Sequence, residues 1–308
     1  MQTQLSVLGP LLPRWVRSRW LLEEALRDLS PATRPVAAVA TAAAAELSDT
    51  RAGVTGDDWV YRQTYLYEYG GLETFLRDAA PAALVDESDS VERWAQSSMG
   101  GYHLEGHAPA ITTWTDLGTG EEVGVPALGS GVLMAPGEQA IGRLVPVEGG
   151  RMFESAPLPV AHRVARRVAD DPTGWLDALR AERDAGGEVR TGGNPSGLIA
   201  DVPDAVLILA VFPRVHWGSG YSDDALVASL MSSARSALAE HAGFRVPTDL
   251  ISPWPCLAAA TVDPLVLAAM AGAPAAADAA VLQRLGTLLA EPAAAVCRSL
   301  ARAVRAVA

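Results

Sequence analysis

The chain contains no lysine, and all 24 of its basic residues are arginine. A chain without lysine cannot form a Schiff base with pyridoxal phosphate. It also lacks the lysine that Walker A loops and protein kinases place against phosphates. These chemistries are therefore excluded. The arginine bias itself is typical of a GC-rich genome.

Cysteine is nearly absent as well, with Cys256 and Cys297 the two examples among 308 residues. Two cysteines supply neither a disulfide framework nor a zinc finger. A long unbroken apolar run is also lacking, so we expect no membrane-spanning helix and no membrane partner. Near the start of the chain the arginines follow the short apolar stretch, the reverse of a signal peptide. We therefore expect a soluble cytoplasmic protein.

Positive charge is in deficit, because the net charge is −12. Nucleic-acid binding depends mainly on Lys and Arg that neutralise phosphates, so we expect no nucleic-acid partner. With 49% apolar and 19% charged residues, the chain has the composition of a globular protein.

The first region is predicted to be helical. Apolar residues recur at helical spacing in 13–48, and "SPATRP" separates two helices. The next segment, 59–76, holds four tyrosines within nine residues: Tyr61, Tyr65, Tyr67 and Tyr69. A helix is favoured there because no Gly or Pro precedes Gly70. The tyrosines indicate either the edge of a core or an aromatic binding surface.

The middle region has the alternation and turn signals of short strands. "GTGEE" and "PGEQ" are typical of tight turns. We expect a small antiparallel sheet or a partial barrel. The five predicted strands are 102–108, 111–117, 122–128, 131–135 and 140–147.

The last region is predicted to be mostly helical. Residues 159–186 form two helices separated by "DDPTG", and 205–212 has the continuous apolar run of one buried strand. A further helix runs from the N-cap Ser222 to Gly243, and Pro292 separates the last two helices. The residues that form a basic face on the first of these helices are His162, Arg163, Arg166 and Arg167. Such a face is usually solvated, and its alternative role is to contact an acidic partner or a phosphate.

These patterns predict the α+β class. The expected regions are a helical N-terminal region at 1–90, an antiparallel β-module at 91–158 and a helix-rich C-terminal region at 159–308. The boundaries are soft, and one compact domain would also fit them.

The stretch "GGYHLEGHAP" is a candidate metal site. On a strand, His103, Glu105 and His107 would share one face, opposite Tyr102 and Leu104. Two histidines and a carboxylate are a legitimate ligand set for a divalent metal. However, the outer two residues of a flat strand lie ~13 Å apart, so chelation needs a bend. A polar outer strand face is the favoured interpretation.

The loop 213–223 is the second candidate site. It follows the predicted buried strand, at a position where open sheets bind ligands. His216, Ser219 and Tyr221 are potentially catalytic, as in a hydrolase or transferase, and glycines flank Ser219. The loop matches neither the Gly-x-Ser-x-Gly elbow nor a dinucleotide-binding loop. An ordinary strand–helix connection is therefore favoured.

Taken together, the residues predict an accessory or interaction protein without a recognisable catalytic centre. Its partner would be another protein or a small molecule. We expect no cofactor. The alternatives are a metal-dependent enzyme that uses the His-x-Glu-x-His strand and a hydrolase or transferase centred on the loop 213–223.

Overall fold

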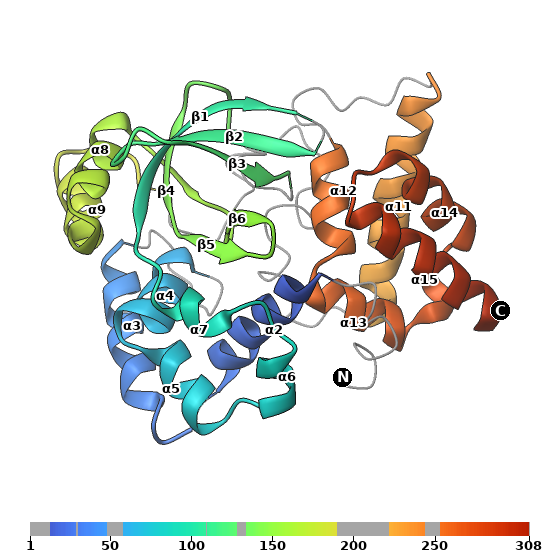
Figure 1. The fold of residues 1–308 in the computed structure, drawn as a ribbon, viewed down its shortest axis with the longest axis horizontal. Coiled ribbons are helices and arrows are strands. Elements are labelled where there is room, and N and C mark those ends of the chain that lie inside the picture. Colours follow the sequence, from blue (N-terminus) through green and yellow to red (C-terminus); the bar gives the residue numbers. More distant parts are fainter. Residues whose placement is uncertain are drawn as a thin grey trace. The chain divides into compact units, whose positions relative to one another are not determined.

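The computed structural model describes residues 13–28, 30–47, 58–108, 110–127, 134–189, 222–243 and 253–307. The chain forms two compact units. Unit 1 comprises Met1–Val16, Ala127–Leu133 and Ile199–Ala308, and unit 2 comprises Arg17–Pro126 and Met134–Leu198. Helices occur toward both ends of the chain, with an antiparallel five-stranded sheet between them (Figure 1). The expected α+β class is confirmed, whereas the division into 1–90, 91–158 and 159–308 stays a prediction.

Short helices precede the sheet, and the two expected in 13–48 are present. They are α2 (Arg14–Arg27), α3 (Arg34–Leu47), α4 (Trp59–Gln63), the π-helical turn η2 (Thr64–Glu68), α5 (Gly71–Asp78), α6 (Ala82–Asp86) and α7 (Val91–Ala95). The tyrosine-rich segment is helical up to Gly70, as expected, but its second half is π-helical. Gly70 has a φ of 67°, a left-handed conformation that glycine adopts without strain.

Two of the four tyrosines belong to the core. Tyr65 is fully buried, and its hydroxyl donates to the Ala25 carbonyl at 2.9 Å. Tyr61 stacks on it, with the ring centroids 5.7 Å apart. Packing of these rings against α2 therefore accounts for half of the tyrosine pattern.

The strands form two antiparallel sheets. They are β1 (Gly100–His107), β2 (Ile111–Asp116), β3 (Glu122–Pro126), β4 (Gln139–Gly142), β5 (Leu144–Val147), β6 (Gly150–Phe153) and β7 (Leu158–Val160). One sheet has the order β3-β2-β1-β4-β7, and the other pairs β5 with β6. β3 and β6 also lie side by side, so the two sheets enclose one core, as in a partial barrel.

Three of the five predicted strands match β1, β2 and β3. The predicted strand 140–147 is wrong as a single strand, because it breaks at Arg143 into β4 and β5. Residues 131–133 of another predicted strand lie outside the described residues, and Met134 and Ala135 are not in a strand. The short β6 and β7 were not expected.

Alternation along the strands builds the core of the β-module. Tyr102 and Leu104 face inward, as the sequence predicts. Phe153 of β6 packs edge-to-face against both Tyr102 and Trp114, with ring centroids 5.1 Å apart in each pair. The remaining core residues are Val123, Val125, Met134 and Ala140.

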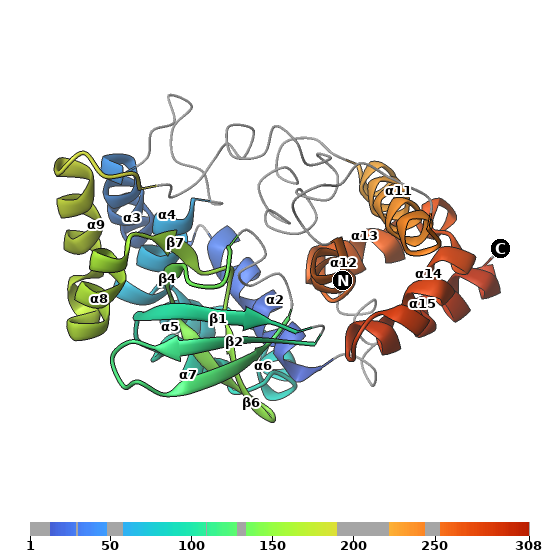
Figure 2. The ribbon, with the colours of Figure 1, turned by 90° about the horizontal axis from the view of Figure 1, so that it is seen from above.

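Two helices follow the strands: α8 (His162–Asp170) and α9 (Trp175–Asp184), separated at "DDPTG" as expected. α8 packs against β1, and the two helices lie side by side (Figures 1 and 2). The approach is close at Gly101, where a Cβ atom would lie 1.9 Å from the Ala165 carbonyl oxygen. Only glycine fits there.

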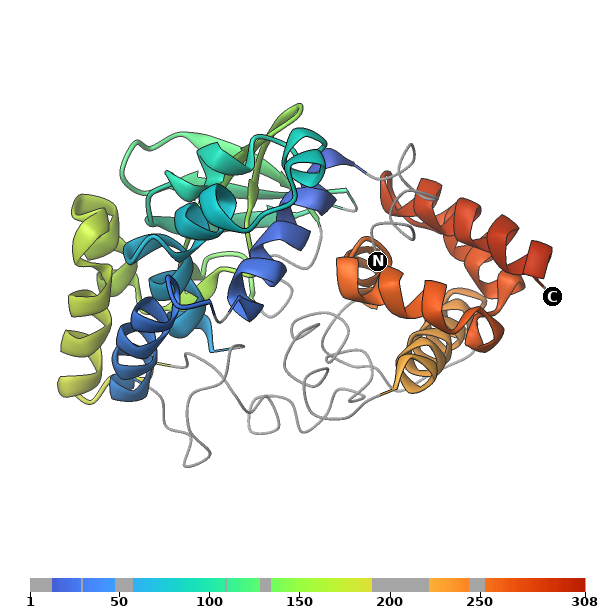
Figure 3. The same cartoon turned by 90° about the horizontal axis from the view of Figure 1, so that it is seen from below.

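The described part of unit 1 is helical. It contains α11 (Asp223–His241), α12 (Pro253–Thr261), α13 (Pro264–Gly272), α14 (Ala279–Leu288) and α15 (Ala293–Val307). α14 and α15 pack along each other (Figure 3, red). The buried residues of α11 include Leu226, Leu230 and Met231. The predicted strand 205–212 lies outside the described residues. Within the described part, no helix has both the length and the apolar character to span a bilayer.

Candidate functional site

A β-bulge at Glu105 changes the direction of the strand that carries the two histidines. Before the bulge His103 pairs with Thr115, and after it His107 pairs with Thr112. Paired residues of an antiparallel ladder point to the same face. Thr112 and Thr115 are three apart on β2 and therefore point to opposite faces. His103 and His107 are thus on opposite faces, whereas a flat strand would place them together.

The contacts of these residues follow this geometry. Gln139 Nε2 lies within hydrogen-bond distance of His103 Nδ1, at 2.8 Å. His103 Nε2 lies 3.9 Å from Glu105 Oε1, which accepts from Thr115 Oγ1 at 2.5 Å. His107 contacts a backbone carbonyl instead, at 3.2 Å. Among the described residues, no group of three or more His, Cys, Asp or Glu could hold a metal ion. The metal assignment stays a prediction.

The second predicted site is the loop 213–223, of which residues 213–221 lie outside the described residues. His216, Ser219 and Tyr221 belong to that part, and their catalytic role stays a prediction. Ser222 is described, and its Oγ accepts from the Ala225 amide at 3.3 Å at the start of α11. The helix start expected there is confirmed.

Two arginines of the basic face on α8 form hydrogen bonds to other residues of unit 2. Arg163 holds the buried Glu182 with two bonds of 2.5 and 2.7 Å. Arg166 Nη1 donates to the Leu117 carbonyl at 2.8 Å. These bonds tie α8 to α9 and to the end of β2, so half of this face has a structural role.

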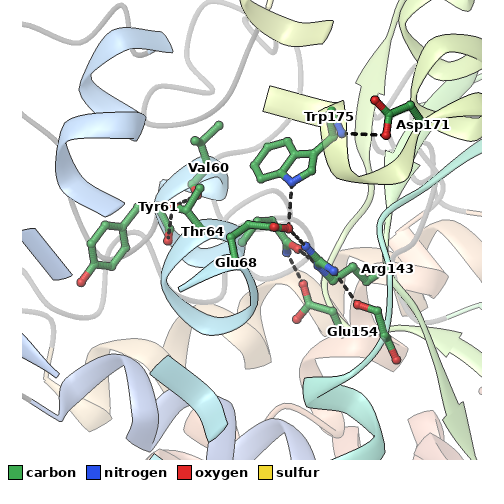
Figure 4. Close-up of polar contacts among 11 residues, drawn as sticks. Val60, Tyr61, Thr64, Glu68, Arg143, Glu154, Asp171 and Trp175 are labelled. Atoms are coloured by element: carbon green, nitrogen blue, oxygen red, sulfur yellow. Dashed lines mark hydrogen bonds and ion pairs between the residues drawn. The ribbon is translucent and has the colours of Figure 1, made fainter. Parts of the chain in front are cut away.

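A buried polar cluster, which the sequence did not predict, lies where the strand break between β4 and β5 meets η2. We call it the Arg143 cluster (Figure 4). Its members are Gln63, Tyr67, Glu68, Arg143, Glu154 and Trp175.

Arg143 is the centre of the cluster and occupies the single residue between β4 and β5. Its side chain is 4% exposed. Nε donates to Gln63 Oε1 at 2.9 Å, Nη1 donates to the Ser97 carbonyl, and Nη2 donates to Glu68 Oε1. The guanidinium also lies over the Tyr67 ring, 4.5 Å from its centroid, in a cation–π contact. Every edge of the guanidinium therefore has a partner.

Glu68 connects the cluster to solvent. Figure 4 shows it between the Trp175 indole and the Arg143 guanidinium. Its Oε1 accepts from Trp175 Nε1 at 2.9 Å and from Arg143. The Glu68 side chain is 31% exposed, and the neighbouring Tyr69 is among the exposed large apolar residues. The cluster is thus buried at Arg143 and accessible at Glu68.

Glu154 and Tyr67 are the unusual members of the cluster. Glu154 Oε1 accepts from Gln63 Nε2 and from Ser155 Oγ. Glu154 Oε2 and the Tyr67 hydroxyl are both buried, and neither has a hydrogen-bond partner outside this pair. Burial, followed by the charge of Glu154, raises the pKa of the Tyr67 hydroxyl well above its ordinary value, although Arg143 opposes this. Glu154 also raises this pKa as a hydrogen-bond partner of the Tyr67 hydroxyl, so the buried donor and the buried acceptor lie close to each other.

The π-helical turn η2 positions Tyr67 and Glu68. The Tyr69 amide donates to the Thr64 carbonyl at 3.0 Å, a step of five residues instead of four. The Thr64 hydroxyl donates to the Val60 carbonyl at 2.7 Å (Figure 4). π-helical turns are rare and are often found at functional sites. This turn cannot be read from the sequence, which indicated only an aromatic segment.

Asp58 caps α4, the helix that leads into η2. Its side chain accepts from the Tyr61 amide at 3.0 Å and is buried. Burial raises the pKa of Asp58 from 3.8 to about 6, although the hydrogen bonds from the Tyr61 and Val60 amides oppose the shift. Desolvation, which raises the pKa of Asp58, thus outweighs the capping hydrogen bonds, which lower it.

A scan with models of protein families, and searches of curated proteins and of solved structures, found no match to this chain.

Proposed function

We propose that the protein is an accessory protein that binds a small polar molecule, and that unit 2 binds it at the Arg143 cluster. One observation carries the proposal: Glu154 Oε2 and the Tyr67 hydroxyl are buried together, with no hydrogen-bond partner outside the pair. An unsatisfied buried polar atom costs about 1–3 kcal/mol, so native proteins rarely leave one without a reason. A bound molecule would satisfy both atoms.

Two further features support a binding role. These two groups lie next to a π-helical turn, a form of backbone enriched at functional sites. The cluster also reaches solvent at Glu68, whose side chain is 31% exposed. The tyrosine-rich segment would then have two roles, with Tyr61 and Tyr65 in the core and Tyr67 at the site.

Native mass spectrometry tests the proposal. The full chain is incubated with the low-molecular-mass fraction of a cell extract and then desalted. We expect a small added mass on the wild-type protein that Glu154→Gln and Tyr67→Phe both lose. Glu182→Gln is the matched control, because Glu182 is also a buried glutamate of unit 2 but lies on α9. A wild-type mass equal to that of the polypeptide alone, under every condition, would contradict the proposal.

A metal-dependent activity at β1 is the second candidate. It is favoured by one observation, that His103 Nε2 and Glu105 Oε1 lie 3.9 Å apart on the same stretch of strand. Since His107 points to the other face, His103 and Glu105 would need a further ligand from elsewhere.

A further inference from the structure

Two buried tyrosine hydroxyls of unit 2 have partners of different chemistry. The Tyr65 hydroxyl donates to the Ala25 carbonyl at 2.9 Å, and a carbonyl oxygen is not a base at neutral pH. The Tyr67 hydroxyl has the side chain of Glu154 as its hydrogen-bond partner. A carboxylate is a base, and both groups of this pair are buried. The Tyr67 hydroxyl therefore has a proton acceptor in place inside the protein.

A proton acceptor at this position matters for the loss of an electron from Tyr67. A phenol that loses one electron becomes a strong acid, so its proton must leave with the electron. The positive charges of Arg143 and Arg62 act on Tyr67, and Arg143 lies 4.5 Å from the centre of its ring. Positive charge so close disfavours a radical cation. A neutral radical, with the proton on Glu154, avoids this repulsion.

Aromatic and polar side chains connect the pair with a partly exposed residue. Trp175 Nε1 donates to Glu68 Oε1 at 2.9 Å, and Glu68 in turn binds Arg143 (Figure 4). The Trp59 ring packs edge-to-face on the fully buried Trp175, with the ring centroids 5.6 Å apart. Trp59 itself is half-buried. Tryptophan and tyrosine are readily oxidised by loss of one electron, so the electron can leave Tyr67 by way of Trp175 and Trp59.

We propose that Tyr67 is a redox-active tyrosine, which gives one electron to an outer-sphere one-electron oxidant and its hydroxyl proton to Glu154. The oxidant is reduced by one electron. The O–H bond of Tyr67 breaks, and a new O–H bond forms on the Glu154 carboxylate. The products are a neutral tyrosyl radical and a carboxylic acid. This inference does not depend on the proposed function, because the pair needs no bound molecule.

Flash photolysis of the full chain tests the proposal. The photosensitiser is a tris(bipyridine)ruthenium complex and the electron acceptor is a pentaamminecobalt complex, so that each flash forms a ruthenium complex that is an outer-sphere oxidant. Electron paramagnetic resonance after rapid freezing detects tyrosyl radicals. We expect a tyrosyl signal in the wild type that Tyr67→Phe loses. Tyr65→Phe is the matched control, because it also removes a buried tyrosine hydroxyl, and it should keep the signal.

The proton transfer has its own variant, Glu154→Gln, because glutamine cannot take up the proton. We expect this variant to lose the tyrosyl signal, and we expect the wild-type radical to form more slowly in heavy water. A wild type without the signal, or equal signals in the wild type and Tyr67→Phe, would overturn the proposal. An unchanged signal in Glu154→Gln would refute the transfer to Glu154. Should that variant fail to fold, equal rates in light and heavy water would refute it.

Discussion

The buried cap Asp58 should make the protein less stable as the pH rises from about 4 to about 7. Its pKa is about 6 in the folded protein and 3.8 ordinarily, so the folded state holds this proton more tightly than the unfolded state. The stability from protonated Asp58 is then complete below pH 3.8 and is lost as the pH rises through about 6. A shift of about 2 pKa units corresponds to about 3 kcal/mol.

The variant Asp58→Asn isolates this effect. Asparagine is as good an N-cap as aspartate, and its side chain carries no charge at any pH. We expect the variant and the wild type to unfold with similar free energies near pH 4. Near pH 7 the variant should be more stable, by about 3 kcal/mol.

Urea unfolding of both proteins at a series of pH values measures this difference. Fluorescence of the fully buried Trp94, Trp114 and Trp175 reports on unit 2. Subtracting the pH dependence of one protein from that of the other removes the contribution of carboxylates whose pKa is lowered, such as Asp171 and Asp278. These groups are the same in both proteins. A difference that stays constant from pH 4 to pH 7, or a variant less stable at pH 7, would show that burial does not raise the pKa of Asp58 in the folded protein.

Three further predictions concern stability. Arg143→Met should destabilise by about 3–5 kcal/mol in urea unfolding, because it leaves buried acceptors without a donor. The matched control Arg77→Met, at an exposed arginine, should leave the unfolding curve nearly unchanged. Leu300→Asp places a charge on the buried face of α15 and should lower the free energy of unfolding by about 3 kcal/mol or more. Arg302→Ala, on the exposed face, should lower it by less than about 0.5 kcal/mol. Equal shifts in melting temperature would contradict this assignment of buried and exposed faces. If β1 binds no metal, a chelator should leave the melting temperature unchanged, and His103→Ala should lower the free energy of unfolding by less than about 0.5 kcal/mol. A stoichiometric metal that the wild type retains on dialysis and the variant loses would contradict this.

The regular parts of the fold could be predicted because local signals fix them. Alternation along β1 identified Tyr102 and Leu104 as the inward face. The breaks at "DDPTG" and Pro292, and the helix limits at Ser222 and Gly243, follow from backbone preferences of single residues. Such signals depend on neighbours in the sequence.

The irregular parts could not be predicted, because contacts distant in sequence determine them. The bulge at Glu105 moves His107 to the opposite face, and the sequence offers only the adjacent Gly106 as a hint. The Arg143 cluster joins Gln63 to Glu154, which are 91 residues apart. One signal was present: Arg143 is the single charge in the apolar run "AIGRLVPV". A charge in such a run requires buried partners.

A crystal structure of the full chain, after incubation with the low-molecular-mass fraction of a cell extract, would show whether a molecule binds at the Arg143 cluster. The decisive feature is the density around the Tyr67 hydroxyl and Glu154 Oε2. We predict density for a bound molecule within about 3 Å of both atoms. Tyr67 and Glu154 bonded to each other alone, with no added density beside them, would contradict the proposed function.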